Sequence, residues 1–146
     1  MKTLQTLIDT QDPGLPELQT MLSEAERPCE LLPPSPQNAD VLLHLQVTTR
    51  SLLGTVAYET GGILIDHGWL RILGSGHARL SRNLKDWNAD ASRGYLLIAD
   101  DAAGGFFALN GGGLGSDVGA LYYWSPDSLT WEALEIGYGD FLGWAL

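Results

Sequence analysis

The chain of 146 residues is poor in cysteine, in basic residues and in long apolar runs. Its single cysteine, Cys29, has no partner for a disulfide within the chain, which fits a reducing cytoplasm. The chain contains eight Lys and Arg residues and 18 Asp and Glu residues, which gives a net charge of −10. This charge argues against nucleic acid and anionic membranes as partners. No apolar run approaches the ~20 residues needed to cross a bilayer. We therefore expect a soluble, cytoplasmic protein that attracts basic partners.

Motifs that carry chemistry are also scarce. Residues 111–115 are rich in glycine, but no Gly-Lys-Ser/Thr follows them and Asp117 would repel a phosphate, so a plain hairpin loop is favoured over a nucleotide site. The run Gly74-Ser75-Gly76 lacks the flanking residues of a nucleophile elbow. On this basis we expect no catalytic residue and no cofactor.

The most informative stretch runs from Tyr95 to Trp124. Three short apolar runs, Tyr95–Ala99, Phe106–Leu109 and Ala120–Trp124, are separated by segments that contain Gly, Asp or Asn. Glycine tolerates positive φ, and Asp and Asn bond to their own backbone, so these segments bend the chain. The apolar runs have the length and the aromatic content of strands, which predicts an antiparallel meander.

Hydrophobic spacing, Gly and Pro predict the remaining elements. Helices are expected near residues 4–8, 16–27, 36–45 and 81–88, and over 141–146 with Asp140 as the cap. Further strands are expected at 55–59, 63–65, 69–73 and 129–134, with a short edge strand near residues 31–32. The sequence thus predicts an α+β fold in a single domain over 1–146: N-terminal helices packed on a mainly antiparallel, meander-type sheet of about five to seven strands, with a short C-terminal helix.

A polar group provides the best candidates for chemistry. Histidine near a carboxylate suits a general base or a metal site with nitrogen and oxygen ligands. Adjacent residues such as Asp66 and His67 point to opposite faces when extended, so roles in turns are favoured over binding, and binding over catalysis. The group consists of Asp66, His67, His77, Asp100 and Asp101.

Aromatic residues add a second kind of candidate. Most of them are expected in the core, but Tyr122-Tyr123-Trp124 on one strand must turn at least one ring to the opposite face. An exposed aromatic ring beside acidic residues makes a plausible binding anchor. With the polar group, the candidate binding residues are Asp66, His67, Trp69, His77, Asp100, Asp101, Asp117 and Tyr122.

Several longer motifs resemble an uncharacterised bacterial family catalogued as domain of unknown function 2625. They are Leu45–Ser51, Tyr58–Gly62, Asp66–Gly76, Leu97–Asp101, Gly104–Gly111 and Tyr138–Leu142. The resemblance spans nearly the whole chain and assigns no catalytic residue. It implies that relatives continue beyond the position of Leu146, so that this chain is expected to be shortened at its C-terminus.

A looser resemblance is to the SUKH superfamily, the fold of many bacterial toxin-immunity proteins. It rests on the N-terminal helices, the glycine-containing strand Gly104–Asn110, the aromatic strand Leu121–Trp124 and the closing Asp140-Phe141-Leu142. This resemblance implies a protein-binding module and not an enzyme.

Our leading hypothesis is a non-catalytic, immunity-like module whose acidic sheet face masks a basic partner such as a toxin domain. The alternative is a small-molecule-binding protein or metal-assisted enzyme that uses Asp66, His67, His77 and Asp100 around a glycine-lined cleft. A third possibility is a homo-oligomer in which a second copy covers the apolar segment Phe141–Leu146.

Overall fold

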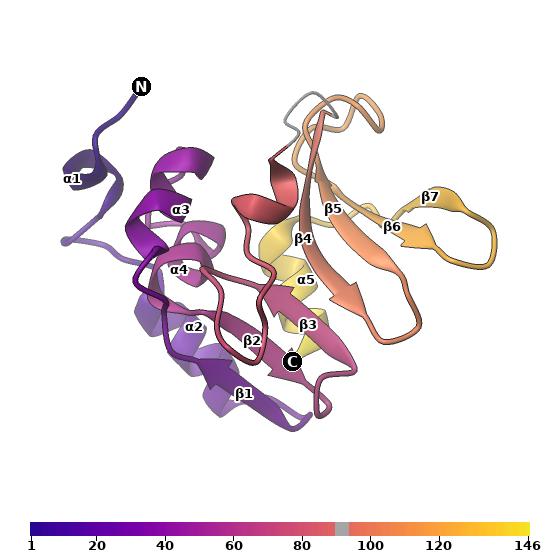
Figure 1. The fold of residues 1–146 in the computed structure, drawn as a ribbon, viewed down its shortest axis with the longest axis horizontal. Helices are drawn as coiled ribbons and strands as arrows, with labels where there is room; N and C mark the ends of the chain where they lie inside the picture. The colour runs from indigo at the N-terminus through magenta and orange to yellow at the C-terminus, as the bar shows by residue number, and fades with distance from the viewer. Residues whose placement is uncertain (90–93) are drawn as a thin grey trace.

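The computed structural model describes residues 1–89 and 94–146, and within them it forms helices and one antiparallel sheet of seven strands (Figure 1). The helices are α1 (Leu4–Leu7), α2 (Leu15–Ser23), α3 (Asn38–Leu45), α4 (Leu52–Glu59), the 3₁₀ turn η1 (Asp86–Asn88) and α5 (Tyr138–Ala145). The strands are β1 (Cys29–Leu32), β2 (Gly62–Ile65), β3 (Leu70–Leu73), β4 (Tyr95–Asp101), β5 (Phe106–Asn110), β6 (Leu121–Ser125) and β7 (Thr130–Ala133). The predicted α+β class is confirmed.

The sheet is a meander in which every strand pairs with the next one along the chain. Its order is β1-β2-β3-β4-β5-β6-β7, and each pairing is antiparallel. The register shifts once, between Leu97 and Ala99 on β4, where Ile98 has no opposite residue on β5. Such a bulge bends a strand and increases its twist. The edge strand expected near residues 31–32 is present as β1.

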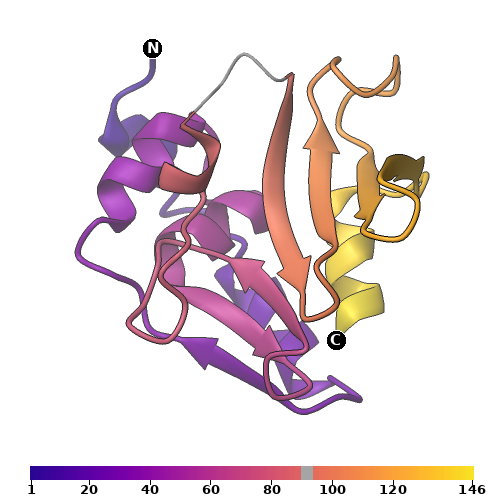
Figure 2. The ribbon, with the colours of Figure 1, turned by 45° about the vertical axis from the view of Figure 1, so that its right-hand side comes forward.

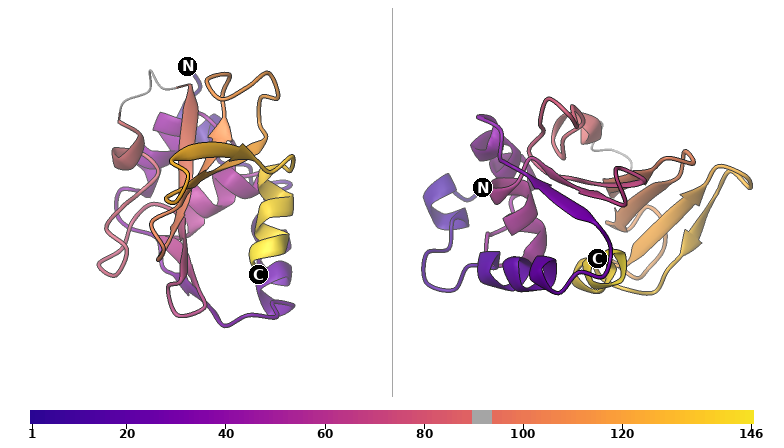
Figure 3. Two further views of the ribbon diagram at one scale, coloured as in Figure 1. Left: turned by 90° about the vertical axis from the view of Figure 1, so that its right-hand side faces the viewer. Right: turned by 90° about the horizontal axis from the view of Figure 1, so that it is seen from below.

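The two faces of the sheet are covered differently. Helices α2, α4 and α5 lie against one face, which we call the helix face, while the segment 74–89 with η1 lies on the opposite, outer face (Figures 2 and 3). Segment 74–89 contributes Leu80 and Leu84 to the core, at 3% and 0% exposure. The outer face also carries a row of half-buried aromatic rings, Trp87, Phe106 and Trp124. The ring centroid of Phe106 lies 5.5 Å from that of Trp87 and 5.4 Å from that of Trp124.

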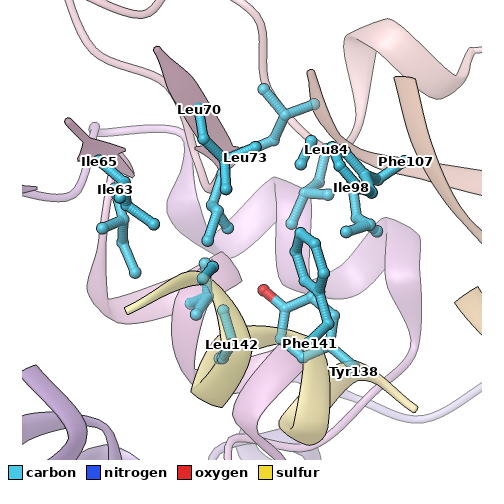
Figure 4. Close-up of a cluster of buried hydrophobic side chains, with 14 of the residues drawn as sticks. Ile63, Ile65, Leu70, Leu73, Leu84, Ile98, Phe107, Tyr138, Phe141 and Leu142 are labelled. Carbon is cyan, nitrogen blue, oxygen red and sulfur yellow. The ribbon is translucent and has the colours of Figure 1, made fainter. Parts of the chain in front are cut away.

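The core is one apolar cluster that fills the space between the sheet and the helices and also includes Leu80 and Leu84 from segment 74–89. It joins Ile63 and Ile65 on β2 to Phe141 and Leu142 on α5, all at 1% exposure or less (Figure 4). Burial of each such side chain stabilises the fold by about 1.5–3 kcal/mol. Tyr138 also lies in this cluster, and Figure 4 shows its hydroxyl pointing inward among apolar side chains.

The prediction of a strand at residues 55–59 is wrong, because these residues form the second half of α4. The side chain of Ser51 accepts a hydrogen bond from the backbone N–H of Gly54 and caps the helix. That bond satisfies an unpaired donor of the first turn and favours a helix over the extended form that Thr55, Val56 and Tyr58 prefer.

Two helix predictions also need correction. Of residues 81–88, only Asp86–Asn88 are helical. The side-chain oxygen of Asn83 accepts hydrogen bonds from the backbone N–H groups of Lys85 and Asp86, and the N–H of Leu84 donates to the carbonyl of Gly74, so these N–H groups are not available for a longer helix. The last helix begins at Tyr138 after Gly137, so Asp140 lies in its first turn and does not cap it. A carboxylate there still interacts favourably with the helix dipole.

Among the described residues, no helix has both the length and the apolar character required to cross a membrane.

Candidate functional site

A groove runs between helix α5 and the helix face of the sheet, and we call it the α5 groove. Its wide part, about 430 Å³, is lined by Asp101, Phe107, Tyr123, Leu134, Ile136 and Trp144. Its narrow part, about 260 Å³, shares Asp101, Phe107 and Trp144 and adds Arg27, Ile65, Asp66, Trp69 and Leu70. The groove therefore combines aromatic rings, two carboxylates and one guanidinium.

Helical periodicity explains why Trp144 lines the groove instead of filling the core. The buried residues of α5 are Tyr138, Phe141, Leu142 and Ala145, which form one stripe at helical spacing. Trp144 lies off this stripe and is 57% exposed. Its ring centroid is 5.9 Å from that of Phe141 and 6.4 Å from that of Phe107, so the indole stands at the edge of the core.

Asp101 is the carboxylate shared by both parts of the groove. Its Oδ1 accepts the backbone N–H groups of Ala103 and Gly105 at 3.0 and 2.8 Å, which fixes the turn between β4 and β5. Its Oδ2 accepts the Tyr123 hydroxyl at 2.8 Å. Burial, and then this bond, raise the pKa of Tyr123 to about 12, so the phenol stays protonated at neutral pH and remains a donor.

Arg27 closes the far end of the groove through contacts with the last turn of α5. Its Nη1 donates to the carbonyl oxygens of Trp144 and Ala145 at 3.2 and 3.0 Å, and its guanidinium lies 5.6 Å from the centroid of the Trp144 ring. The N–H groups of Glu26 and Arg27 both donate to the carbonyl of Leu146. These bonds satisfy carbonyls that the helix itself leaves unpaired.

Charge is distributed very unevenly along the chain. Residues 94–146 contain seven Asp and Glu and no Lys or Arg, so the strands β4 to β7 and helix α5 are purely acidic. Asp127, Glu132 and Glu135 are exposed. Asp127 and Glu132 lie close enough to Tyr123 to raise its pKa further, which places their negative potential beside the groove.

Three of the predicted site residues meet in the α5 groove. Asp66, Trp69 and Asp101 all line its narrow part, and Trp69 is 57% exposed at the turn between β2 and β3. Asp66 adopts positive φ at that turn, as does His67. Trp69 is thus an exposed aromatic residue beside acidic residues, whereas the binding anchor argued from the sequence was a ring of Tyr122-Tyr123-Trp124.

Asp100 points to the outer face and is engaged in an ion cluster. Its carboxylate, 9% exposed, lies 2.8 Å from Nε of Arg71 and 3.1 Å from Nη2 of Arg82. The bond to Asp100 raises the pKa of Arg71. Arg82 also stacks 5.8 Å from the centroid of the Trp87 ring. One carboxylate between two guanidiniums ties β3, β4 and segment 74–89 together.

The two histidines line other hollows than the carboxylates with which they were grouped. His67 lines a hollow with Cys29 and Arg79, whereas His77 lines a polar hollow with Ser35 and Asn83. Nδ1 of His77 accepts the N–H of Arg79 at 3.1 Å. In the described part of the chain, no three His, Cys, Asp or Glu residues are placed to hold a metal ion. This arrangement argues against a shared Asp66, His67, His77 and Asp100 centre.

Asp117 and Tyr122 bind each other. The Tyr122 hydroxyl donates to Oδ1 of Asp117 at 2.7 Å, which lowers the pKa of Asp117 and raises that of Tyr122. The glycine-rich loop before them is also closed internally. Gly111 and Gly113 donate to the carbonyl of Gly94, and Gly112 and Leu114 donate to Oδ1 of the buried Asn110. Their N–H groups are thus not free to cradle a phosphate.

Sequence reasoning missed Arg27, Phe107 and Trp144 as groove residues. The signal for Trp144 was present, since it falls outside the apolar stripe of α5. Nothing local marks Arg27, because its partners on α5 lie 117 and 118 residues further along the chain.

Comparisons with known proteins identify one family and two uncharacterized relatives. The family described as "Protein of unknown function DUF2625" matches residues 4–146. An uncharacterized protein, YbfG, of Escherichia coli K12 is 49% identical over 150 residues, covering 100% of this chain and 69% of that protein. An uncharacterized protein of Haemophilus influenzae Rd is 44% identical over 154 residues, covering 100% of this chain and 68% of that protein. None of these descriptions states an activity.

Proposed function

This chain belongs to the family "Protein of unknown function DUF2625", and we propose that it is a protein-binding module that engages a basic partner through the α5 groove and the acidic strands beside it. One observation carries the proposal. Residues 94–146 hold seven carboxylates and no Lys or Arg, and they supply most of a groove whose rim carries an exposed tryptophan.

The aromatic residues supply the anchor. Trp69 and Trp144 are each 57% exposed and line the same groove from opposite elements, the β2–β3 turn and α5. Large exposed apolar side chains next to a hollow mark interaction sites, and tryptophan is among the residues that dominate binding energy in interfaces.

The charge supplies selectivity and speed. Carboxylates at Asp127, Glu132 and Glu135 have no basic neighbour in their own half of the sequence, whereas Asp100 is neutralised by Arg71 and Arg82 on the outer face. Residues 94–146 therefore carry −7 of the net charge of −10, and part of this charge lies on the strands and loops that surround the groove. A complementary surface of this kind raises the association rate and repels acidic competitors.

The resemblance to the SUKH superfamily would make the partner a basic toxin domain and the protein its immunity factor. That reading is part of the proposal and rests on the short motifs in the N-terminal helices, the strands and the final helix. The acidic groove fits it, because a basic enzyme that acts on nucleic acid is masked by an acidic surface.

Two triple variants with the same net charge test the proposal. In the first, Asp127→Asn, Glu132→Gln and Glu135→Gln neutralise three exposed carboxylates on β7 and in the loops on either side of it. In the control, Asp40→Asn, Glu17→Gln and Glu24→Gln neutralise three exposed carboxylates on α2, on α3 and just after α2. Binding of the wild type and both variants to a set of small basic proteins, including secreted nucleases, is measured by interferometry at several salt concentrations.

We expect salt-sensitive binding of the wild type to at least one basic protein, weakened by the first variant and little changed by the control. Equal weakening by both variants would show that net charge, and not this surface, is responsible. Absence of binding to every basic protein would contradict the proposed function.

A further inference from the structure

We infer that the wide part of the α5 groove is a pocket for one arginine side chain of the partner. This inference rests on the proposed function and deepens it, because it names the group that the groove receives. It follows from the shape of the pocket, from the state of its one carboxylate and from the way the protein places its own guanidinium.

The walls of the pocket match the two halves of an arginine side chain. Leu134 and Ile136 offer an apolar surface for the three methylene groups. The rings of Tyr123 and Trp144 offer flat faces for the guanidinium, and both pack on the buried ring of Phe107, with centroid distances of 4.8 Å to Tyr123 and 6.4 Å to Trp144. A planar, weakly hydrated guanidinium stacks on such faces better than the strongly hydrated ammonium of lysine.

Asp101 supplies the counter-charge with one position left for a donor. Its Oδ1 already accepts two backbone N–H groups, whereas Oδ2 accepts only the Tyr123 hydroxyl among the described residues. A carboxylate oxygen accepts up to two hydrogen bonds, so Oδ2 retains a site for an N–H of the ligand. The tyrosine and the turn hold the carboxylate in place before the ligand arrives, which reduces the entropic cost of binding.

The protein's own Arg27 shows that this aromatic surface accepts a guanidinium. It lies over Trp144 in the narrow part of the groove and is held by the carbonyls of Trp144 and Ala145. Arg27 does not line the wide part, and no Lys or Arg does. The wide part therefore has the rings and the carboxylate of a guanidinium site, and the cation is left for a partner to supply.

Capped peptides of the sequence Gly-Ala-X-Ala-Gly, with X as arginine, lysine or citrulline, test the inference. Citrulline keeps the shape of arginine and removes its charge. Binding is followed by the nuclear magnetic resonance signal of the Trp144 indole N–H, assigned with Trp144→Ala. We expect the arginine peptide to bind tightest, and the citrulline peptide about tenfold or more weaker, as expected for loss of a charge-assisted hydrogen bond.

Two variants place the peptide in the pocket. Asp101→Asn should weaken the arginine peptide and reduce its preference over citrulline. Because Asp101 also fixes the β4–β5 turn, Leu134→Trp serves as a second variant that adds bulk to the pocket lining and leaves the carboxylate intact. Val118→Ala, at an exposed residue that lines neither part of the groove, is the control and should leave peptide binding within about twofold, because its contacts are not involved.

Equal binding of the three peptides, or unchanged arginine binding in the Leu134→Trp variant, would overturn the inference. If a basic protein binds through the acidic strands and yet Leu134→Trp leaves that binding intact, the pocket is wrong and the proposed function stands. If the arginine peptide binds in the pocket but no basic protein does, the proposed function fails and the pocket remains.

Discussion

Tyr138 is a tyrosine whose hydroxyl group lies in an apolar environment. Its ring packs in the core, 9% exposed, and among the described residues its hydroxyl has no hydrogen-bond partner. Burial alone raises the pKa of this phenol. A buried hydroxyl without a partner costs the free energy of its lost hydration, whereas the ring itself contributes to the core.

Tyr138→Phe should therefore stabilise the protein by about 1–2 kcal/mol, because it removes only the unpaired hydroxyl. Tyr122→Phe is the matched control. It deletes a hydroxyl that donates to Asp117 at 2.7 Å, and it should destabilise by about 1 kcal/mol. Urea denaturation followed by circular dichroism measures both changes. A loss of stability in Tyr138→Phe would show that the hydroxyl has a partner.

Helices α4 and α5 each contain a glycine, and the two glycines differ in what surrounds them. A Cβ on Gly54 in α4 would overlap the carbonyl of Thr48, so the absence of a side chain lets the helix lie against residues 48–49. A Cβ on Gly143 in α5 would meet nothing within 4 Å. The same substitution thus has opposite consequences in the two elements.

Gly54→Ala should destabilise by about 1–3 kcal/mol, the usual cost of forcing extra volume into a packed site, despite the better helix propensity of alanine. Gly143→Ala should stabilise by about 0.5–1 kcal/mol, because only the propensity changes. Thermal and urea unfolding of both variants provide the measurement. Stabilisation by Gly54→Ala would mean that α4 moves away from residues 48–49 without cost.

The elements that were predicted correctly are those set by local chemistry. Gly, Asp and Asn between short apolar runs gave β4, β5 and β6, since each turn is decided within a few residues. The error at residues 55–59 arose because β-branched and aromatic residues favour strands, while the deciding signals were the Ser51 cap and the close packing of Gly54. The second of these depends on tertiary contact and cannot be read from composition.

At the scale of the whole molecule, the site was predicted only in part. Trp69 and Asp101 were identified from residue type, and they share the groove with Asp66. Asp100 was grouped with Asp101, yet adjacent residues on a strand face opposite sides, and here one lines the groove while the other binds two arginines. The contribution of Arg27 depends on contact between segments 117 residues apart, for which a single sequence gives no signal.

Three tyrosines link the stability of the whole molecule to alkaline pH. Hydrogen bonding to Asp117 raises the pKa of Tyr122, burial raises those of Tyr123 and Tyr138, and the value for Tyr123 is about 12. The unfolded chain loses these protons near pH ~10. Since the folded state keeps them, the contribution of these tyrosines to stability should be constant below that pH and should fall as the pH rises toward 12.

Urea midpoints from neutral pH up to about pH 11 measure this loss, with tyrosinate absorbance reporting ionisation. Tyr123→Phe should make the alkaline decline shallower, because one of the linked groups is removed. A midpoint that stays constant across this range would contradict the raised pKa values.

The hydrogen bonds between Arg27 and the last turn of α5 have a consequence for the folding of the chain during translation. Because strands β1 to β7 pair in chain order, each can dock as soon as it leaves the exit tunnel. Arg27, in contrast, must wait until residues 117 and 118 positions later have been translated. We expect a nascent chain to expose the part of the helix face that α5 covers until then, and to be a client of ribosome-associated chaperones for that interval.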